Sequence, residues 1–119
     1  MKKILIVDDD STLRFLISET LKLDDENNVF EAADGLEAIR VYDDICPDLV
    51  LLDAMMPVMS GFEVAEQIKV KKPKPVIILL TAQAQANINF EISQYGIDHF
   101  LSKPFSPINL LQFIEKIFI

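Results

Sequence analysis

The sequence predicts an α/β domain with a doubly wound, five-stranded parallel sheet, built from five strand-helix units. Three short apolar runs, at residues 4–7, 49–52 and 76–80, show no alternation of apolar and polar residues. Such runs are typical of strands buried on both faces. Segments with helical periodicity separate them, and this order favours right-handed crossovers with helices on both faces of the sheet.

The first unit begins with the apolar run at residues 4–7, which ends at three consecutive aspartates. A helix with Asp10 or Ser11 as its N-cap is expected next, because one apolar stripe runs along it, formed by Leu13, Leu16, Ile17 and Leu21. The second strand is the weaker run at 29–33, which we expect nearer an edge. Residues 33–35 then have the composition of an ordinary turn.

The third strand, at residues 49–52, precedes a helix whose start is marked by Ser60 and Glu63, at the spacing of a capping box. The fourth strand, at 76–80, leads into a helix that Gly96 is well placed to end. Both strands are apolar throughout, so the two units are expected at the centre of the sheet.

The fifth strand is the weaker run HFLS at residues 99–102, which we expect near the other edge. The last helix begins at Ser106, an N-cap residue followed by Pro107 at the first helical position. In open sheets of this kind, ligands bind outside the carboxyl ends of the strands, where the strand order reverses. The loops after the strands are therefore the places to look for a site.

Length and composition indicate a single domain over residues 1–119, half of them hydrophobic. The net charge of −8 argues against direct binding to nucleic acid or an anionic membrane surface. No apolar run approaches the roughly 18 residues that span a bilayer. The single cysteine, Cys46, forms no internal disulfide, and acids follow the first apolar run at once, so we expect a cytoplasmic protein.

Polar side chains directly follow four of the five expected strands. They are Asp8, Asp9 and Asp10 after the first, Asp53 after the third, Thr81 after the fourth and Lys103 after the fifth. Carboxylates gathered at one edge repel one another unless a cation joins them, and oxygen-only ligands suit Mg²⁺. A lysine and a threonine hydroxyl beside them are the groups that hold a phosphoryl group during its transfer.

Two interpretations of the acidic stretch assign the reactive atom to different residues. In one, Asp8 is the covalent nucleophile of a D-x-D-x-T signature, as in haloacid-dehalogenase-like Mg²⁺ phosphatases. In the other, Asp8 and Asp9 are metal-site residues that serve a nucleophile elsewhere. The phosphatase interpretation needs a late acidic pair, whereas only Glu115 follows the fifth strand, and it leaves Asp53 without a role.

Four segments, ILIVDDDSTLR, PDLVLLDAMMPVMSGFEV, PVIILLTAQA and HFLSKPF, together resemble the receiver domain of two-component response regulators, of the CheY-like single-domain type. The resemblance covers the whole chain and implies the flavodoxin-like strand order 2-1-3-4-5. It implies that Asp53 accepts a phosphoryl group from a sensor histidine kinase or phosphotransfer protein. It also implies that Mg²⁺ binds Asp9, Asp53 and the backbone carbonyl of Met55, with Asp8 acting largely through water.

The same resemblance assigns the remaining site residues. Thr81, Ala82 and Lys103 would contact the phosphoryl group, and the peptide bond between Lys103 and Pro104 would be cis. Phe100 would be the switch residue, turning inward when phosphorylation draws Thr81 toward the phosphoryl group. The alternative is that Phe100 is simply a core residue of its strand.

The resemblance also implies that two positions border the path of the water that hydrolyses the acyl phosphate. Met55 and Gln83 occupy these positions here, and an apolar methionine cannot orient that water. We therefore expect slow self-dephosphorylation in a protein that is not a classical enzyme beyond its own phosphorylation and dephosphorylation.

The last two helices carry more apolar surface than their own packing requires. In the final helix the apolar side chains spread over an arc of about 160°, which is wider than the roughly 100° stripe of a surface helix. In the fourth helix, Phe90 is expected on the side opposite the inward-facing apolar stripe. We expect Phe90, Phe113 and Ile117 to form a surface, with the fifth strand, for a target protein or a homodimer. Alternatively the excess packs on a downstream segment, since the chain also fits the N-terminal receiver of a longer regulator.

Overall fold

A parallel five-stranded sheet forms the centre of the protein, with the strands in the order β2-β1-β3-β4-β5. The computed structural model describes residues 2–82 and 94–118. Its strands are β1 (Lys2–Val7), β2 (Asn27–Ala32), β3 (Leu49–Asp53), β4 (Val76–Thr81) and β5 (His99–Ser102). Every neighbouring pair is parallel. The doubly wound sheet and its flavodoxin-like strand order are thereby confirmed.

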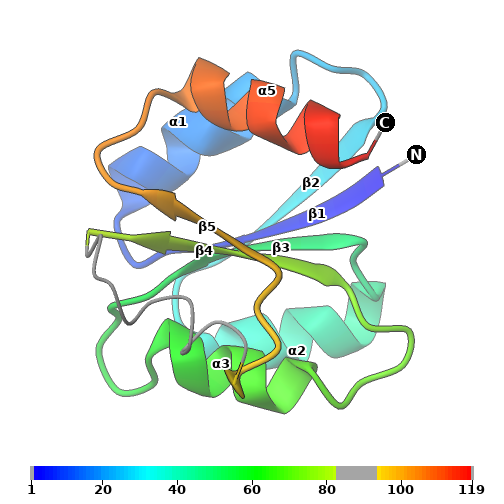
Figure 1. Cartoon of the computed structure of the whole chain (residues 1–119), viewed down its shortest axis with the longest axis vertical. Coiled ribbons are helices and arrows are strands. Elements are labelled where there is room, and N and C mark those ends of the chain that lie inside the picture. The colour runs from blue at the N-terminus through cyan, green and yellow to red at the C-terminus, as the bar shows by residue number, and fades with distance from the viewer. Residues whose placement is uncertain (1, 83–93, 119) are drawn as a thin grey trace.

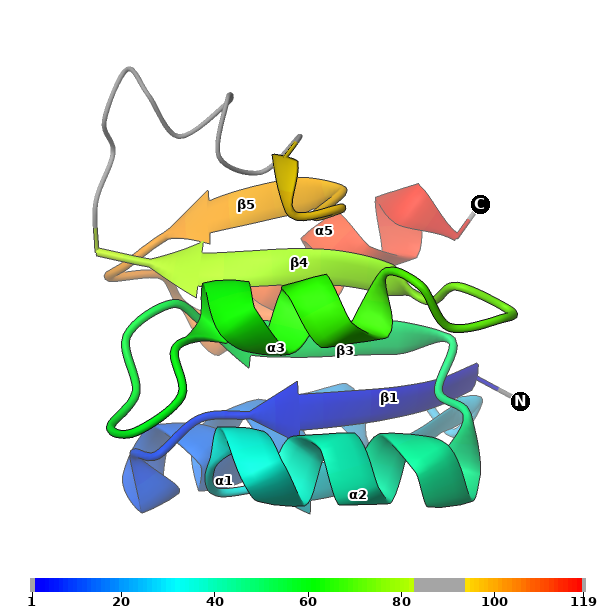
Figure 2. The same cartoon turned by 90° about the horizontal axis from the view of Figure 1, so that it is seen from below.

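Helices cover both faces of this sheet. The helices of the described residues are α1 (Ser11–Leu21), α2 (Gly35–Ile45), α3 (Gly61–Ile68) and α5 (Pro107–Ile117). Figure 1 shows α1 and α5 on one face and α2 and α3 on the other, and Figure 2 shows α2 and α3 in front of the sheet. The expected fourth helix falls largely on residues 83–93, outside the described ranges, so its existence stays a prediction.

The unbroken apolar character of the central strands follows from their burial on both faces. Ile4 and Ile6 pack with residues of α1 and α5, whereas Leu5 and Val7 pack with residues of α2 and α3. All four are fully buried. Because successive side chains point to opposite faces of a strand, a strand between two helical layers needs apolar residues at every position.

The helix starts lie where the sequence indicated. Ser60 and Glu63 form a reciprocal capping box at α3, and Ser106 caps α5 with Pro107 at its first position. Of the two candidate N-caps of α1, Asp10 caps the helix, since its carboxylate accepts hydrogen bonds from the backbone nitrogens of residues 12 and 13. The segment after β2, expected to be an ordinary turn, also starts a helix, because Asp34 is the N-cap of α2.

The expected apolar stripe on α1 is wrong at one position. Leu16 is 47% exposed, whereas Ser18 is buried at 2% exposure together with Ile17 and Leu21. At 100° per residue, positions 16 and 18 flank position 17 on opposite sides, so a small rotation of the helix decides which of them faces the sheet. The periodicity predicts the buried face but not that rotation.

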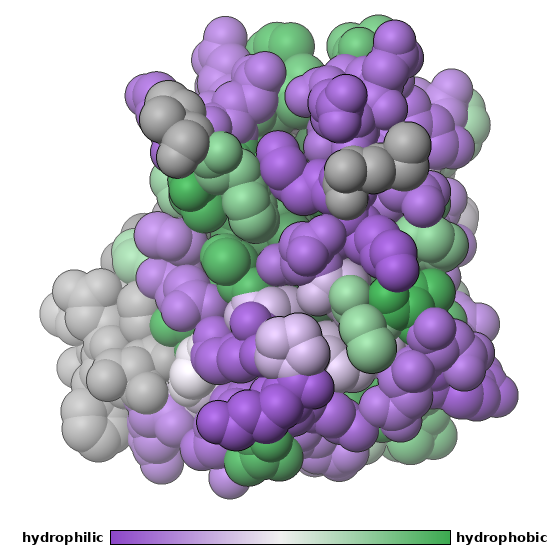
Figure 3. All heavy atoms as spheres, turned by 90° about the vertical axis from the view of Figure 1, so that its right-hand side faces the viewer, coloured by the Kyte–Doolittle hydropathy of each residue, from purple (hydrophilic) through white to green (hydrophobic). Residues whose placement is uncertain are grey.

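The amino ends of the strands form the end of the molecule shown in Figure 3, where hydrophilic side chains cover most of the surface. Here the Lys2 ammonium lies 4.7 Å from the centre of the Phe118 ring, near α5. Within the described ranges, no helix has both the length and the apolar character that crossing a membrane requires.

Candidate functional site at the carboxyl ends of β1, β3, β4 and β5

The strand order brings the predicted polar residues together at one edge of the sheet. Asp8 directly follows β1, and Asp53 ends the neighbouring strand β3, at the point where the strand order reverses. One carboxylate oxygen from each of Asp8, Asp9 and Asp53 lies within 4.8 Å of the others. Three residues separated by up to 45 positions thus form one acidic cluster.

The ammonium group of Lys103 faces this cluster. The Nζ atom of Lys103 lies 3.2 Å from Oδ1 of Asp53 and 3.5 Å from Oδ2 of Asp8. The lysine follows β5 directly, and its backbone nitrogen donates to the carbonyl of Thr81 at 2.7 Å, which ties the ends of β4 and β5 together. The Lys103–Pro104 peptide bond is cis, and so is Lys72–Pro73.

Burial makes the electrostatics of these groups strong. Asp8 is fully buried and Asp53 is 6% exposed. Burial raises the pKa of Asp53, and the charge of Asp8 raises it further, while Lys103 lowers it without reversing the direction. Burial alone would lower the pKa of Lys103, but the charges of Asp53 and Asp8 outweigh it and raise that pKa. The site therefore holds unbalanced negative charge.

The donor set fits a hard divalent cation such as Mg²⁺. All three side chains offer carboxylate oxygens, whereas Cys46 ends α2 and His99 begins β5, away from this edge. Asp8 already accepts from the backbone nitrogen of Asp10 at 2.9 Å and faces Lys103. Asp9 is exposed, so its oxygens are the more available ones for an ion.

The loop after Asp53 is fixed by the close approach of α3. Gly61 opens that helix, and a Cβ atom there would overlap the backbone carbonyl of Asp53. Its nitrogen donates to the carbonyl of Ala54 at 3.0 Å, and the nitrogen of Met55 lies 3.4 Å from Oδ1 of Asp53. Only glycine permits this contact, which holds the carboxylate and the following backbone in place.

One residue near the site escaped the sequence reasoning. Arg14 donates from Nη1 to the backbone carbonyl of Asp8 at 2.7 Å and from Nε to Oε1 of Glu31 at 3.0 Å. A signal existed in the sequence, because a cation near the amino end of a helix opposes the helix dipole. Its place there indicates a specific anionic or carbonyl partner.

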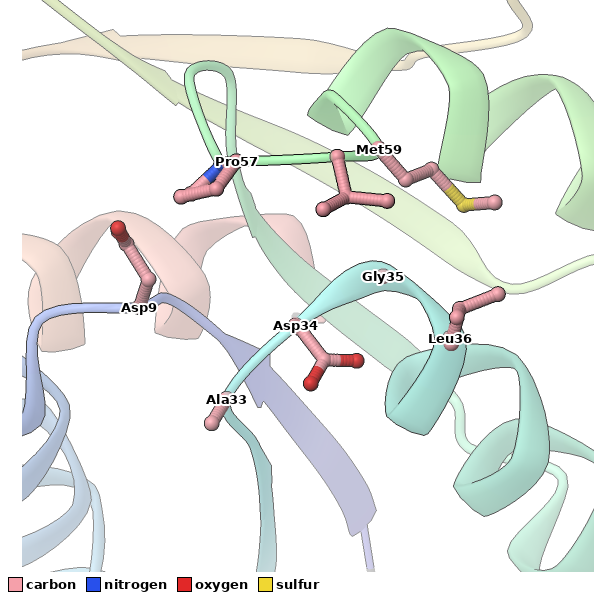
Figure 4. A pocket seen from close by; sticks show the side chains of 8 residues that line it. Asp9, Ala33, Asp34, Gly35, Leu36, Pro57 and Met59 are labelled. Atoms are coloured by element: carbon pink, nitrogen blue, oxygen red, sulfur yellow. The ribbon is translucent and has the colours of Figure 1, made fainter.

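A shallow pocket of about 280 Å³ adjoins the acidic cluster. Figure 4 shows it between the loops that follow β1, β2 and β3, with Asp9 projecting toward Pro57. Its lining is otherwise mainly apolar, and one lining residue, Val58, is 93% exposed with a φ of 70°. A β-branched residue is rarely found in this left-handed conformation.

The remaining predicted residues lie along β4, β5 and α5. Thr81 is buried and Ala82 is exposed, whereas Phe100 is half-buried against the cluster beneath α2 and α3. Phe113 and Ile117 are also half-buried, since both pack partly on the core, and the Phe113 ring meets His99 edge-on at 5.7 Å. Phe90 and Gln83 lie outside the described residues.

Fold and site together define a doubly wound α/β domain with a lysine-bearing acidic site at its switch point. The model of the response regulator receiver domain matches residues 4–115. The chain belongs to the response regulator receiver family. This membership sets aside the haloacid-dehalogenase-like alternative.

Individual relatives agree with this assignment. The chemotaxis protein CheY of Listeria monocytogenes is 39% identical over 116 residues, which is 98% of each chain. The structure of the chemotaxis protein CheY4 of Vibrio cholerae superposes with a TM-score of 0.90 at 33% identity, covering 98% of both chains. The alkaline phosphatase synthesis transcriptional regulatory protein PhoP of Bacillus subtilis is 36% identical over 109 residues, but these are only 44% of its length.

Proposed function

We propose that this chain is a phosphorylation-controlled signalling switch in which Asp53 accepts a phosphoryl group from the phosphohistidine of a sensor kinase or phosphotransfer protein. The observation that carries the proposal is the position of Asp53, which is buried near Asp8 and lies 3.2 Å from the Lys103 ammonium that the two carboxylates share. Its carboxylate is the acidic group of the cluster that both faces the ammonium and ends a central strand. We place the protein in the cytoplasm, where such donors act.

Bound Mg²⁺, held by Asp9, Asp53 and the Met55 carbonyl with Asp8 behind it, would neutralise charge on the phosphoryl oxygens. The chain itself supplies the nucleophile. An Asp53 carboxylate oxygen attacks phosphorus, the nitrogen–phosphorus bond breaks, and its electron pair returns to the donor's imidazole ring. The product is an acyl phosphate on Asp53, whose oxygens Lys103 and the Thr81 hydroxyl hold.

The output follows from the position of Thr81 and Lys103 at the ends of β4 and β5. When both turn toward a phosphoryl group, Phe100 on β5 moves further into the space behind Thr81. The surface that we expect Phe90 to form with β5 and with Phe113 and Ile117 of α5 would then change shape for a target protein or a second copy. Met55, 68% exposed beside the site, has no polar group that could orient the hydrolytic water, so we expect the phosphorylated form to be long-lived.

A second function is favoured by a specific observation. Similarity to PhoP covers 44% of that protein, and similarity to the response regulator DrrB of Thermotoga maritima, with a TM-score of 0.89, covers 52% of that chain. Domains similar to this chain therefore also form one part of longer regulators. If this chain belongs to such a regulator, its phosphorylation would control an attached output domain.

The test is phosphorylation by acetyl phosphate with Mg²⁺, followed by intact-mass measurement. We expect one phosphoryl group on the wild type and none on Asp53→Asn, while Asp8→Asn is still modified at a lower rate. Undiminished modification of Asp53→Asn would refute the proposal. Loss of modification in Asp8→Asn alone would instead identify Asp8 as the nucleophile.

A Mg²⁺ titration of Asp8→Asn and Asp9→Asn tests the proposed ligand roles. Asp8 is engaged by the Asp10 backbone and by Lys103, whereas Asp9 is exposed. We therefore expect Asp9→Asn to weaken Mg²⁺ binding more. Equal affinities in the two variants would contradict this assignment.

A further inference from the structure

Arg14 joins three elements around the proposed metal site. It lies on α1, it donates to the Asp8 carbonyl in the loop after β1, and it pairs with Glu31 on β2, the strand beside β1. The arginine side chain is 18% exposed and that of Glu31 is 42% exposed. A guanidinium with two partners in a fixed fork holds a definite orientation, which a single ion pair on a flexible chain does not.

The bond to the Asp8 carbonyl bears directly on Asp9. The carbonyl of Asp8 and the nitrogen of Asp9 belong to one planar peptide unit, so a partner that fixes the carbonyl also fixes the plane from which Asp9 projects. At 2.7 Å this is a short, charge-assisted hydrogen bond. Because Asp9 is exposed, little packing constrains its side chain, and its backbone sets where its carboxylate lies.

We propose that Arg14, anchored by Glu31, is a positioning residue for the metal site: it holds the loop after β1 so that Asp9 faces Asp53 and Asp8. The inference rests on the proposed function, since it concerns the same Mg²⁺ site. It adds a determinant of metal affinity that touches neither the ion nor the phosphoryl group. Glu31 is the second part of this determinant, because it prevents the guanidinium from swinging away from the loop.

The charge of Arg14 and its positioning role predict opposite effects of its removal on Mg²⁺ affinity. Removing a cation near three carboxylates should by Coulomb's law strengthen Mg²⁺ binding. Removing a group that positions a ligand should weaken it, by about tenfold if it matches the lower end of what outer partners of metal ligands contribute. Arg14→Met therefore separates the two effects by the sign of the change in affinity.

The experiment is a calorimetric Mg²⁺ titration of purified wild type, Arg14→Met, Arg14→Lys and the double variant Arg14→Met with Glu31→Gln. We expect binding to weaken by about tenfold in Arg14→Met. The double variant, which restores the net charge, should match it. Arg14→Lys, which keeps the charge but reaches only one partner at a time, should fall between Arg14→Met and the wild type. Lys71→Met is the matched control, because its ion pair with Asp43, at 2.7 Å, also joins separate elements; its affinity should equal that of the wild type.

Phosphorylation by acetyl phosphate over a range of Mg²⁺ concentrations supplies the second measurement. Mispositioning of Asp9 should raise the Mg²⁺ concentration at half-maximal rate while the rate at saturating Mg²⁺ stays close to that of the wild type. Unchanged or stronger Mg²⁺ binding in Arg14→Met overturns the proposal, and so does an equal fall in affinity in Lys71→Met. If wild type binds Mg²⁺ but is not modified, the proposed function fails while the titration still decides the role of Arg14.

Discussion

Replacing Asp53 by asparagine should stabilise the metal-free protein, although it removes the proposed phosphorylation site. Asp53 is 6% exposed, and burying an ion costs several kcal/mol. At an effective dielectric constant of about 20, the pair with Lys103 at 3.2 Å contributes about 5 kcal/mol, and repulsion from a carboxylate up to 4.8 Å away costs about 3.5 kcal/mol. Burial and repulsion together exceed the attraction, in agreement with the raised pKa of Asp53.

Asparagine keeps the size of the side chain and leaves Lys103 its second partner, Asp8, at 3.5 Å. We therefore expect the free energy of unfolding of Asp53→Asn to exceed that of wild type by about 1–3 kcal/mol at pH 7 in the presence of a chelator. Urea unfolding followed by circular dichroism measures it, because the chain contains no tryptophan. Asp44→Asn, on the exposed side of α2, is the matched control and should stay within about 0.5 kcal/mol of wild type.

The pH dependence has a defined sign. The folded-state pKa of Asp53 is raised, so the protonated side chain is the more compatible with the fold. The free energy of unfolding that wild type loses relative to Asp53→Asn is therefore absent below the unfolded-state pKa, about 3.9. The loss grows as the pH rises from there to the folded-state pKa and is complete above it. Mg²⁺ at a hundred times its Kd should raise the free energy of unfolding of wild type by about 2.7 kcal/mol. An Asp53→Asn variant no more stable than wild type at pH 7 without metal would refute this reasoning.

Three further substitutions test local features by urea unfolding. Val58→Gly should stabilise the protein by about 1 kcal/mol, because it relieves a left-handed β-branched residue that is 93% exposed; a loss of stability would show a compensating contact. Ser18→Ala should be neutral or stabilising by about 1 kcal/mol, since its buried hydroxyl has no partner among the described residues; a clear loss would reveal one. Gly61→Ala should cost more than about 2 kcal/mol and weaken Mg²⁺ binding, because the added Cβ overlaps the Asp53 backbone; unchanged stability and affinity would contradict that contact.

The fold was predictable because a strand that is buried on both faces of the sheet has apolar residues at every position. The run ILIV at residues 4–7 has no polar position, and both of its faces are covered by helices. The strand ends were equally plain, since Asp8, Asp53 and Thr81 each follow an apolar run. In a parallel sheet these ends share one edge, so the acidic cluster follows from the order of the elements.

What escaped prediction depends on rotations and on contacts between elements distant in the chain. Whether Leu16 or Ser18 faces the sheet depends on a rotation of α1 that the apolar period does not specify. The contact of Arg14 with Glu31 joins residues 17 positions apart through the pairing of β1 and β2. The φ of 70° at Val58 is hidden as well, because valine is a poor indicator of a left-handed turn.

Lys103 links the carboxylate of Asp53 to the ends of β4 and the edge strand β5. Its ammonium is shared between Asp53 and Asp8, while its backbone nitrogen holds the Thr81 carbonyl at 2.7 Å. A phosphoryl group on Asp53 would move negative charge outward from the carboxylate, and the ammonium would have to follow it. Because that movement begins at the joined ends of β4 and β5, its first mechanical effect falls on the strand that carries Phe100. By this proposal, a change of charge at one buried oxygen would reach the outer edge of the sheet through the Lys103 side chain and one backbone hydrogen bond.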